Sequence, residues 1–151
     1  MDLNLTKCNI MTIKRSTVDQ PACYYIKRYP LQNICSHKYL GIIIQDDLQW
    51  DSQVREVKAK ATKILGLLRR NLSQCSSKVK ERAYNSLVRP RVEYATPAWA
   101  PYEKQHIASI EAVQRSALRF VTGDYSRYSS VTSMRETLGW DTLECRRYLA
   151  A

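Results

Sequence analysis

The hydrophobic period of this chain changes from strand-like to helical at Asp51, and this change constrains the fold more than any other feature. After Asp51, a suitable N-cap, apolar residues recur at the spacing of one helix face. They are Val54, Val57, Ala61, Ile64, Leu65 and Leu68, and the helix is expected to end at Asn71. Before Asp51 the apolar runs are short. The sequence therefore predicts an α+β fold, with short antiparallel β elements in residues 1–50 and a mainly α-helical bundle in residues 51–151.

The first fifty residues contain several runs that favour strands. They are residues 9–13, 18–26 (which include a turn before Pro21), 26–34 and 39–44. A proline in the middle of the third run favours a strand edge or a hairpin connection there. The last run is apolar on both faces, which is typical of one buried strand.

Three more helices are expected after the first. The first of these begins near Ser76-Ser77, the next covers residues 107–121, and the last covers residues 131–138. Pro90 should stop or kink the second helix, and Gly123 should end the third. The proline-containing connection around Trp99 should bend, with that ring as its anchor. Asp141 and Glu144 have the spacing of a capping box for a last helical turn.

Positive charge is concentrated in one segment of the chain. The net charge is +10, and residues 55–91 hold 11 Lys and Arg against Glu56 and Glu81, a net of +9. Scattered charges usually form a solvated helix face. Such a local excess repels itself, however, unless an anionic partner meets it, and a nucleic-acid backbone is the commonest partner of this kind. The charge distribution therefore favours a polyanionic partner.

The sequence lacks the patterns of several enzyme classes. It has no glycine-rich phosphate loop, nucleophile elbow or H-E-x-x-H pattern. Five scattered cysteines without a C-x-x-C pair, and only two histidines, argue for free thiols in a reducing compartment and against a zinc site. No apolar run is long enough to span a bilayer, and no signal peptide is visible. We expect an intracellular protein, cytoplasmic or nuclear, that is not an independent hydrolase.

Two adjacent aspartates, Asp46 and Asp47, follow the apolar run at residues 39–44. Paired carboxylates after a hydrophobic strand can hold Mg²⁺ in two-metal polymerases. Here the chain passes directly from Asp47 into Leu48 and the helix, and few other acidic residues are available nearby. A solvated turn, which favours Asp for its local hydrogen bonding, is the preferred interpretation.

Several motifs in register carry a resemblance to a known family. N-x-x-K-C begins at Asn4, KYLG covers residues 38–41, and L-x-W at residues 48–50 precedes the basic helix. Longer matches follow in order: GLLRRNL (66–72), LVRPRVEYATPAW (87–99), IEAVQRSALRFVTG (110–123) and LGWDTLECRR (138–147). Over almost its entire length the chain resembles the C-terminal part, the end of the palm plus the thumb, of a non-LTR (LINE-type, jockey-like) retrotransposon reverse transcriptase, an RNA-directed DNA polymerase.

The resemblance implies roles for individual residues. Asn4 and Lys7 match a palm motif, in which the lysine is proposed as the general acid for the departing pyrophosphate in the intact enzyme. Residues 38–41 match a strand and turn that grip the primer end. Residues from about 51 match the thumb, which lies along the template–primer duplex. The implied nucleic-acid-binding residues are Lys38, Tyr39, Gly41, Lys58, Lys60, Lys63, Arg69, Arg70, Lys78 and Lys80.

The family's metal-binding aspartates lie upstream of the N-x-x-K motif, and this chain begins three residues before Asn4. We therefore expect a truncated polymerase fragment that binds an RNA–DNA or DNA duplex, without catalytic residues, metal or cofactor of its own. Mg²⁺ would belong to the intact family enzyme. Neither a membrane nor a small-molecule substrate is expected as a partner. Two alternatives remain: a helical protein-interaction module that docks through the apolar stripe at residues 65–68, or a remnant without function.

Overall fold

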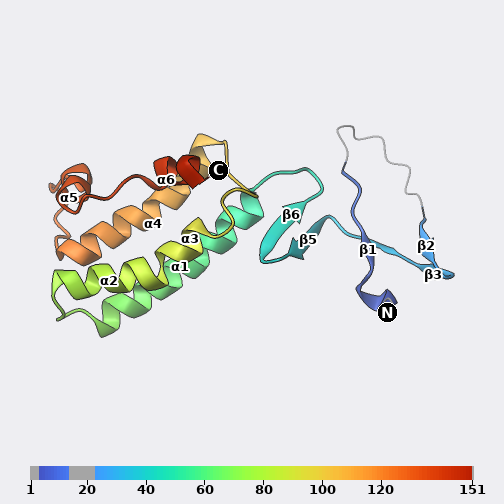
Figure 1. Ribbon diagram of the computed structural model, residues 1–151, viewed down its shortest axis with the longest axis horizontal. Helices are drawn as coiled ribbons and strands as arrows, with labels where there is room; N and C mark the ends of the chain where they lie inside the picture. Colours follow the sequence, from blue (N-terminus) through green and yellow to red (C-terminus); the bar gives the residue numbers. More distant parts are fainter. Residues whose placement is uncertain (1–3, 14–22, 151) are drawn as a thin grey trace. The chain divides into compact units, whose positions relative to one another are not determined.

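The computed structural model describes residues 4–13 and 23–150 of the chain. The chain divides into two compact units, Met1–Ser52 and Gln53–Ala151, and each is described by itself. Short strands make up the first unit and helices make up the second (Figure 1). The predicted α+β fold class is confirmed. The beginning of the run at residues 18–26, including its turn before Pro21, lies outside the described residues.

The strands of the first unit form three separate pairs after a 3₁₀ turn at Leu5–Lys7. Strands β2 (Tyr25–Ile26) and β3 (Tyr29–Pro30) pair antiparallel, and so do β5 (Ser36–Tyr39) and β6 (Ile42–Gln45). Strands β1 (Asn9–Ile10) and β4 (Gln32–Asn33) pair parallel. The expectation of antiparallel strands is therefore correct for two pairs and wrong for the third, whose partners lie 23 positions apart in the register.

The prediction of one buried strand over residues 39–44 is wrong. The chain turns at Leu40 and Gly41, whose φ angles are +46° and +85°. Two consecutive residues with positive φ form the two-residue turn that matches the twist of a hairpin. Tyr39 and Ile42 therefore face each other as partners across β5 and β6. An apolar run with a central glycine satisfies the strand pattern and the hairpin pattern equally.

The second unit contains the helices that the sequence predicts. Helix α1 (Asp51–Asn71) begins at the boundary between the units, and α2 (Ser77–Leu87), α3 (Arg89–Glu93), α4 (Lys104–Thr122), α5 (Val131–Thr137) and α6 (Leu143–Ala150) follow (Figure 1). Pro90 lies in the first turn of α3, where its missing N–H is tolerated, so the predicted break is confirmed. Helix α4 ends at Gly123 in the left-handed conformation, as expected.

The core of this unit contains the apolar stripe of α1 and the apolar face of α4. Five of the six predicted α1 positions are buried, and Ile64 is half-buried. On α4 the buried apolar residues are Ile110, Val113, Ala117, Leu118, Phe120 and Val121. Trp99 is buried as the expected anchor, and its Nε1–H donates to the Tyr94 carbonyl at 3.0 Å. By contrast, none of the described side chains between residues 4 and 52 is buried.

The predicted capping box before α6 is wrong. Thr142, not Asp141, caps the helix: its hydroxyl oxygen accepts a hydrogen bond from the Cys145 N–H at 3.1 Å. The Glu144 N–H donates to the Glu111 carboxylate at 3.0 Å, so a side chain from α4 supplies the second cap acceptor. Asp141 and Thr142 are both residue types that cap helices well. The hydrogen bond from the Glu144 N–H to Glu111, 33 positions earlier in the chain, decides between them.

Alanine substitutions at two glycines of the helical unit should change the free energy of unfolding in opposite directions. Gly66 lies inside α1, and an added Cβ would meet only the Arg70 side chain at 3.8 Å, an ordinary contact. Gly66→Ala should therefore stabilise the protein by about 0.5–1 kcal/mol through helix propensity. Gly123 has a φ of +74°, so Gly123→Ala should destabilise it by about 1 kcal/mol. Urea unfolding followed by circular dichroism measures both. Changes of the same sign would contradict this account of the two helix positions.

Tyr84 makes stability depend on pH at the alkaline end. Its ring stacks on Trp140 at 4.6 Å between centroids, and its hydroxyl is buried without a hydrogen-bond partner. Burial, and next the charge of Glu93, raise the pKa of the Tyr84 phenol. A group with a raised pKa in the folded state contributes to the free energy of unfolding at pH values below its unfolded pKa, which is about 10 for tyrosine. This contribution is lost as the pH rises from that value towards the folded-state pKa.

Tyr84→Phe should therefore leave stability at pH 7 unchanged or slightly higher, because it removes an unsatisfied hydroxyl. Above pH 10 the wild-type free energy of unfolding should fall relative to the variant by about 1.4 kcal/mol per pH unit. Urea titrations between pH 8 and pH 11 measure the difference. Parallel pH profiles for the two proteins would contradict the buried, neutral phenol.

Candidate nucleic-acid interface

Helix α1 presents a row of cations on the side opposite its buried stripe. Arg55, Lys63 and Arg70 are exposed and follow one another at i, i+8 and i+15, which places them within an arc of about 80° on the helix. We call these three residues the α1 cation row. It extends over about 22 Å of helix, at 1.5 Å per residue. Ala59 and Gly66 lie between its members on the same side, so no bulky side chain separates the cations.

The other predicted lysines of α1 lie beside this row. Lys58 and Lys60 are exposed on its two flanks. Lys60 forms an ion pair with Glu56 one turn earlier, which neutralises part of its charge. Lys58 is the flanking cation that adds directly to the positive surface of the row.

Arg69 is directed into the bundle. Its Nη2–H donates to the Ser116 carbonyl at 2.7 Å, and its guanidinium lies 5.9 Å from the Tyr125 ring centroid. These contacts join α1 to α4 and to the segment after it. The structure thus gives Arg69 a packing role, and it does not project with the α1 cation row. The step of about 100° between adjacent helix residues places Arg70 opposite the apolar stripe and Arg69 beside it, a difference that the segment-wide charge count does not register.

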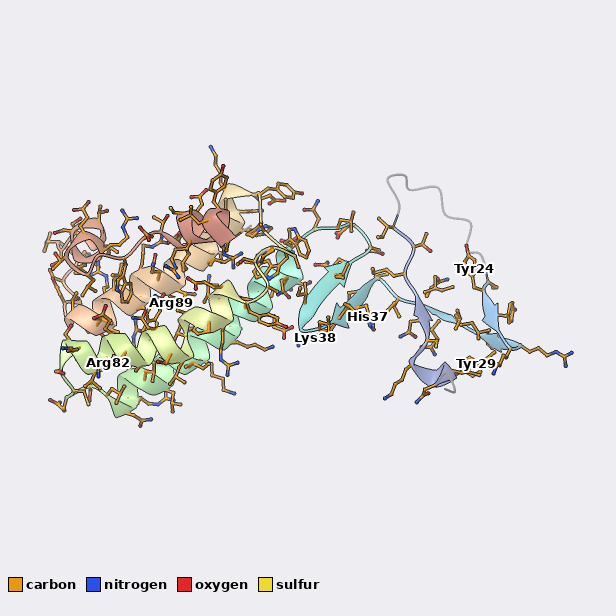
Figure 2. All side chains as sticks on the ribbon, in the orientation of Figure 1. Tyr24, Tyr29, His37, Lys38, Arg82 and Arg89 are labelled. Carbon is orange, nitrogen blue, oxygen red and sulfur yellow. The ribbon has the colours of Figure 1, made fainter. Side chains whose placement is uncertain are left out.

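Helix α2 divides its cations in the same way. Lys78 and Arg82 are exposed one turn apart, and Figure 2 shows Arg82 on this helix. Lys80 is half-buried, and its ammonium lies 5.7 Å from the centroid of the Phe120 ring on α4. Arg82 and Arg55 were absent from the residues predicted for the interface, although both belong to the +9 segment. Their i+4 and i+8 spacing to other exposed cations is the signal that finds them.

The predicted site residues of the first unit lie at its turns. Lys38 and Tyr39 end β5, and Gly41 occupies the hairpin turn with its positive φ. All four side chains of β5 are exposed, and Tyr39 is 61% exposed. Figure 2 labels His37 and Lys38 on this strand. Lys7 is exposed at the end of the 3₁₀ turn, and its backbone N–H donates to the Asn4 carbonyl at 3.1 Å. Asn4 and Lys7 therefore stand at the two ends of one local turn.

The aspartate pair forms a turn. The Asp47 carboxylate accepts a hydrogen bond from the Gln49 N–H at 2.9 Å, and the Leu48 N–H donates to the Gln45 carbonyl at 3.0 Å. Leu48 has a φ of +57°, which closes the turn between β6 and α1. Among the residues that the structure describes, no three His, Cys, Asp or Glu side chains gather where a metal ion could bind. The two aspartates therefore lie in a turn between β6 and α1, as expected.

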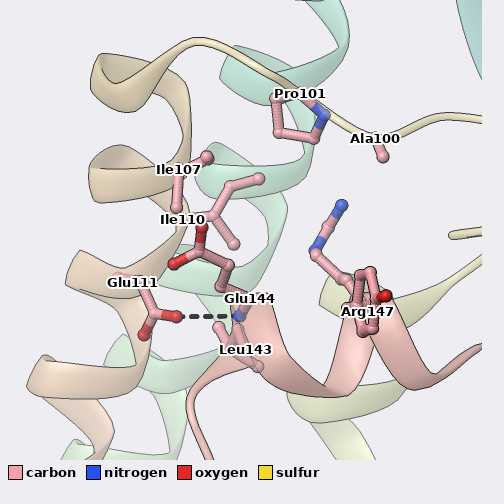
Figure 3. Close-up of a pocket in the computed structure, with 9 residues that line it drawn as sticks. Ala100, Pro101, Ile107, Ile110, Glu111, Leu143, Glu144 and Arg147 are labelled. Atoms are coloured by element: carbon pink, nitrogen blue, oxygen red, sulfur yellow. Dashed lines mark hydrogen bonds between the residues drawn. The ribbon is translucent and has the colours of Figure 1, made fainter.

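A pocket of about 200 Å³ opens between α4 and α6 (Figure 3). Its walls are mainly apolar: Ala100, Pro101, Ile107, Ile110 and Leu143. Arg147 also lines it, but its guanidinium stacks on Trp99 at 4.4 Å and donates to the Val92 carbonyl at 2.6 Å. Burial lowers the pKa of this guanidinium. The pocket therefore lacks the exposed cations that a polyanion needs.

Two further observations concern the sequence expectations. All five cysteines carry free thiols, as predicted. Within the described ranges, no helix is both long enough and apolar enough to cross a bilayer.

One known protein gives these features a context. The chain is 29% identical over 127 residues to the probable RNA-directed DNA polymerase from transposon X-element of Drosophila melanogaster. The aligned region covers 80% of this chain but only 14% of that protein. No protein-family model and no solved structure matches the chain. The match confirms the resemblance to a transposon reverse transcriptase that the motifs indicate.

The turn at the aspartates predicts no specific metal binding. Addition of Mn²⁺ to the purified chain should give the same weak, unsaturated electron paramagnetic resonance titration for the wild type and for Asp46→Asn/Asp47→Asn. Primer extension with Mg²⁺ and deoxynucleotides should be absent in both proteins. Saturable Mn²⁺ binding that the double substitution removes would contradict the turn interpretation.

Proposed function

We propose that this chain is a nucleic-acid-binding segment of a transposon reverse transcriptase, which contacts the template–primer duplex and has no polymerase activity by itself. The α1 cation row is the observation that carries the proposal. The match to an RNA-directed DNA polymerase, over a small part of that protein's length, supports the same enzyme context.

The geometry of α1 suits a phosphate backbone. Arg55, Lys58, Lys63 and Arg70 are exposed cations along about 22 Å of one helix, a length over which one duplex strand presents about six phosphates. Small residues between the cations let the helix approach closely. Contacts of this kind go to phosphates and not to base edges, so binding should tolerate any sequence.

The proposed inactivity rests on the described carboxylates. Asp46 and Asp47 lie in a turn, where a hydrogen bond from Gln49 engages Asp47. The two-metal chemistry of a polymerase needs carboxylates that converge on the ions. In the proposed arrangement, other parts of a longer polymerase hold these ions, and Lys7 and the β5–β6 turn act only in that context.

The protein-interaction alternative loses the surface that first suggested it. Leu65 and Leu68, the centre of the stripe expected to dock a partner, are only 2% and 6% exposed because the unit's own helices cover them. Leu67 is 49% exposed, and it is the one large apolar side chain of α1 in the exposed class. Duplex binding is therefore the function that the second unit supports best.

Charge removal from the α1 cation row tests this proposal. Arg55→Gln/Lys63→Gln/Arg70→Gln should weaken binding to a labelled 20-base-pair RNA–DNA duplex and reduce the salt slope of log Kd by about 3, since each lost phosphate contact removes about one unit. For the wild type, four contacts predict an affinity loss of about 100-fold between 50 and 200 mM salt. Fluorescence anisotropy at several salt concentrations measures both quantities.

A matched variant separates the row from total charge. Lys104→Gln/Arg115→Gln/Arg127→Gln removes three exposed cations from α4 and the segment after it, and lowers the net charge by the same amount. It should retain most of the wild-type salt slope. Equal losses in the two triple variants, or wild-type affinity that does not respond to salt, would overturn the proposal.

A further inference from the structure

The β2–β3 hairpin of the first unit has an unusual turn. Tyr25 pairs with Pro30 and Ile26 with Tyr29, so only Lys27 and Arg28 connect the strands. These two residues have φ angles of +47° and +67°. Asn-Gly or Asp-Gly is the usual choice for such a turn, because side chains with a full Cβ are strained there. The hairpin instead carries two long cationic side chains at its tip, and both are exposed.

The body of the hairpin is aromatic. The Leu31 N–H donates to the Tyr24 carbonyl at 2.9 Å, which extends the antiparallel ladder beyond the strands themselves. Paired residues share a face, so Tyr24, Ile26, Tyr29 and Leu31 lie on one side of the ribbon. Tyr24 and Tyr29 are diagonal neighbours, whose backbone positions are about 7–8 Å apart. Figure 2 shows both on the hairpin.

This aromatic face is open to solvent. Tyr24 is 51% exposed and Tyr29 is 39% exposed, and Tyr25 on the opposite side is 63% exposed. None of the first unit's described side chains is buried, so nothing in that part of the structure covers the hairpin. Exposed rings gathered in this way usually mark a binding surface.

The charge of this region indicates which partner fits. Between Cys23 and Gln45 the chain has no Asp or Glu, while Lys27 and Arg28 are both cationic. Lys27 and Arg28, at the tip of the same hairpin, therefore place two cations beside the tyrosine face. An anionic partner with flat aromatic groups satisfies both features, and unpaired nucleotides have this chemistry. Bases inside a duplex do not, because they already stack on each other.

We propose that the β2–β3 hairpin binds single-stranded nucleic acid, with Tyr24 and Tyr29 stacking on unpaired bases and Lys27 and Arg28 contacting the adjoining phosphates. The inference goes beyond the duplex binding proposed above and does not require it, because the hairpin and the α1 cation row belong to different units of the chain.

A comparison of two probes isolates the stacking. A labelled 12-nucleotide oligo(dT) and an abasic strand of the same length carry the same phosphates, so only the first offers bases. The wild-type chain should bind oligo(dT) at least tenfold more tightly, since each stacked base contributes roughly five- to a hundredfold. Fluorescence anisotropy at one fixed salt concentration measures both affinities.

Four variants assign the preference to the hairpin. Tyr24→Ser/Tyr29→Ser should abolish it, and Tyr24→Phe/Tyr29→Phe should keep it, because the rings remain. Tyr128→Ser removes a 96% exposed tyrosine of the second unit and should change nothing. Lys27→Gln/Arg28→Gln should weaken binding of both strands to a similar extent. Far-ultraviolet circular dichroism checks that the helical unit stays folded in every variant.

Three outcomes would overturn the inference. The wild type could bind both strands equally, the serine variant could keep the preference, or the face could hold a second copy of the chain. The last case would appear as a dimer in sedimentation that the serine variant dissociates, without any preference for bases. The triple substitution in the α1 cation row should leave the ratio of the two affinities unchanged, so failure of duplex binding is distinguishable from failure of this inference.

Discussion

Burial of one apolar stripe along α1 determines where the cations of that helix lie. Because Val54, Val57, Ala61, Leu65 and Leu68 face the core, residues about 120° to 180° from the centre of this stripe face solvent. Arg55, Lys63 and Arg70 occupy those positions. The positive surface is therefore a consequence of the packing of α1, and a change that rotated the helix would move the cations with it.

The same packing assigns other cations to the interior of the unit. Arg69 bonds to the Ser116 carbonyl, Lys80 lies over Phe120, and Arg147 stacks on Trp99. In each case the charged group contacts an aromatic ring or a backbone carbonyl of the unit. Long cationic side chains commonly pack their apolar stems in this way. A count of charges by segment overstates the positive surface, because these residues contribute to stability and not to an interface.

The local rules of the sequence predict the helical unit well. The 3.6-residue period, the break at Pro90 and the left-handed Gly123 each depend on a few neighbouring residues, and all three are confirmed. The errors arise where distant residues or single φ angles decide. The pairing of β1 with β4 joins segments 23 positions apart, and the α6 cap depends on Glu111 of another helix. The hairpin at Leu40 needs a positive φ at a leucine, which no pattern of apolar residues reveals.

The candidate interface was predictable in its location but not in its membership. Composition identified residues 55–91, and the structure separates Arg70, which projects outwards, from Arg69, which bonds to the Ser116 carbonyl. Lysine acylation footprinting of the chain with and without an RNA–DNA duplex tests the central claim most directly. The duplex should protect Lys58 and Lys63 and leave Lys104 as reactive as in the free chain. Equal protection of all three lysines, or no protection of Lys63, would contradict a duplex-binding surface along α1.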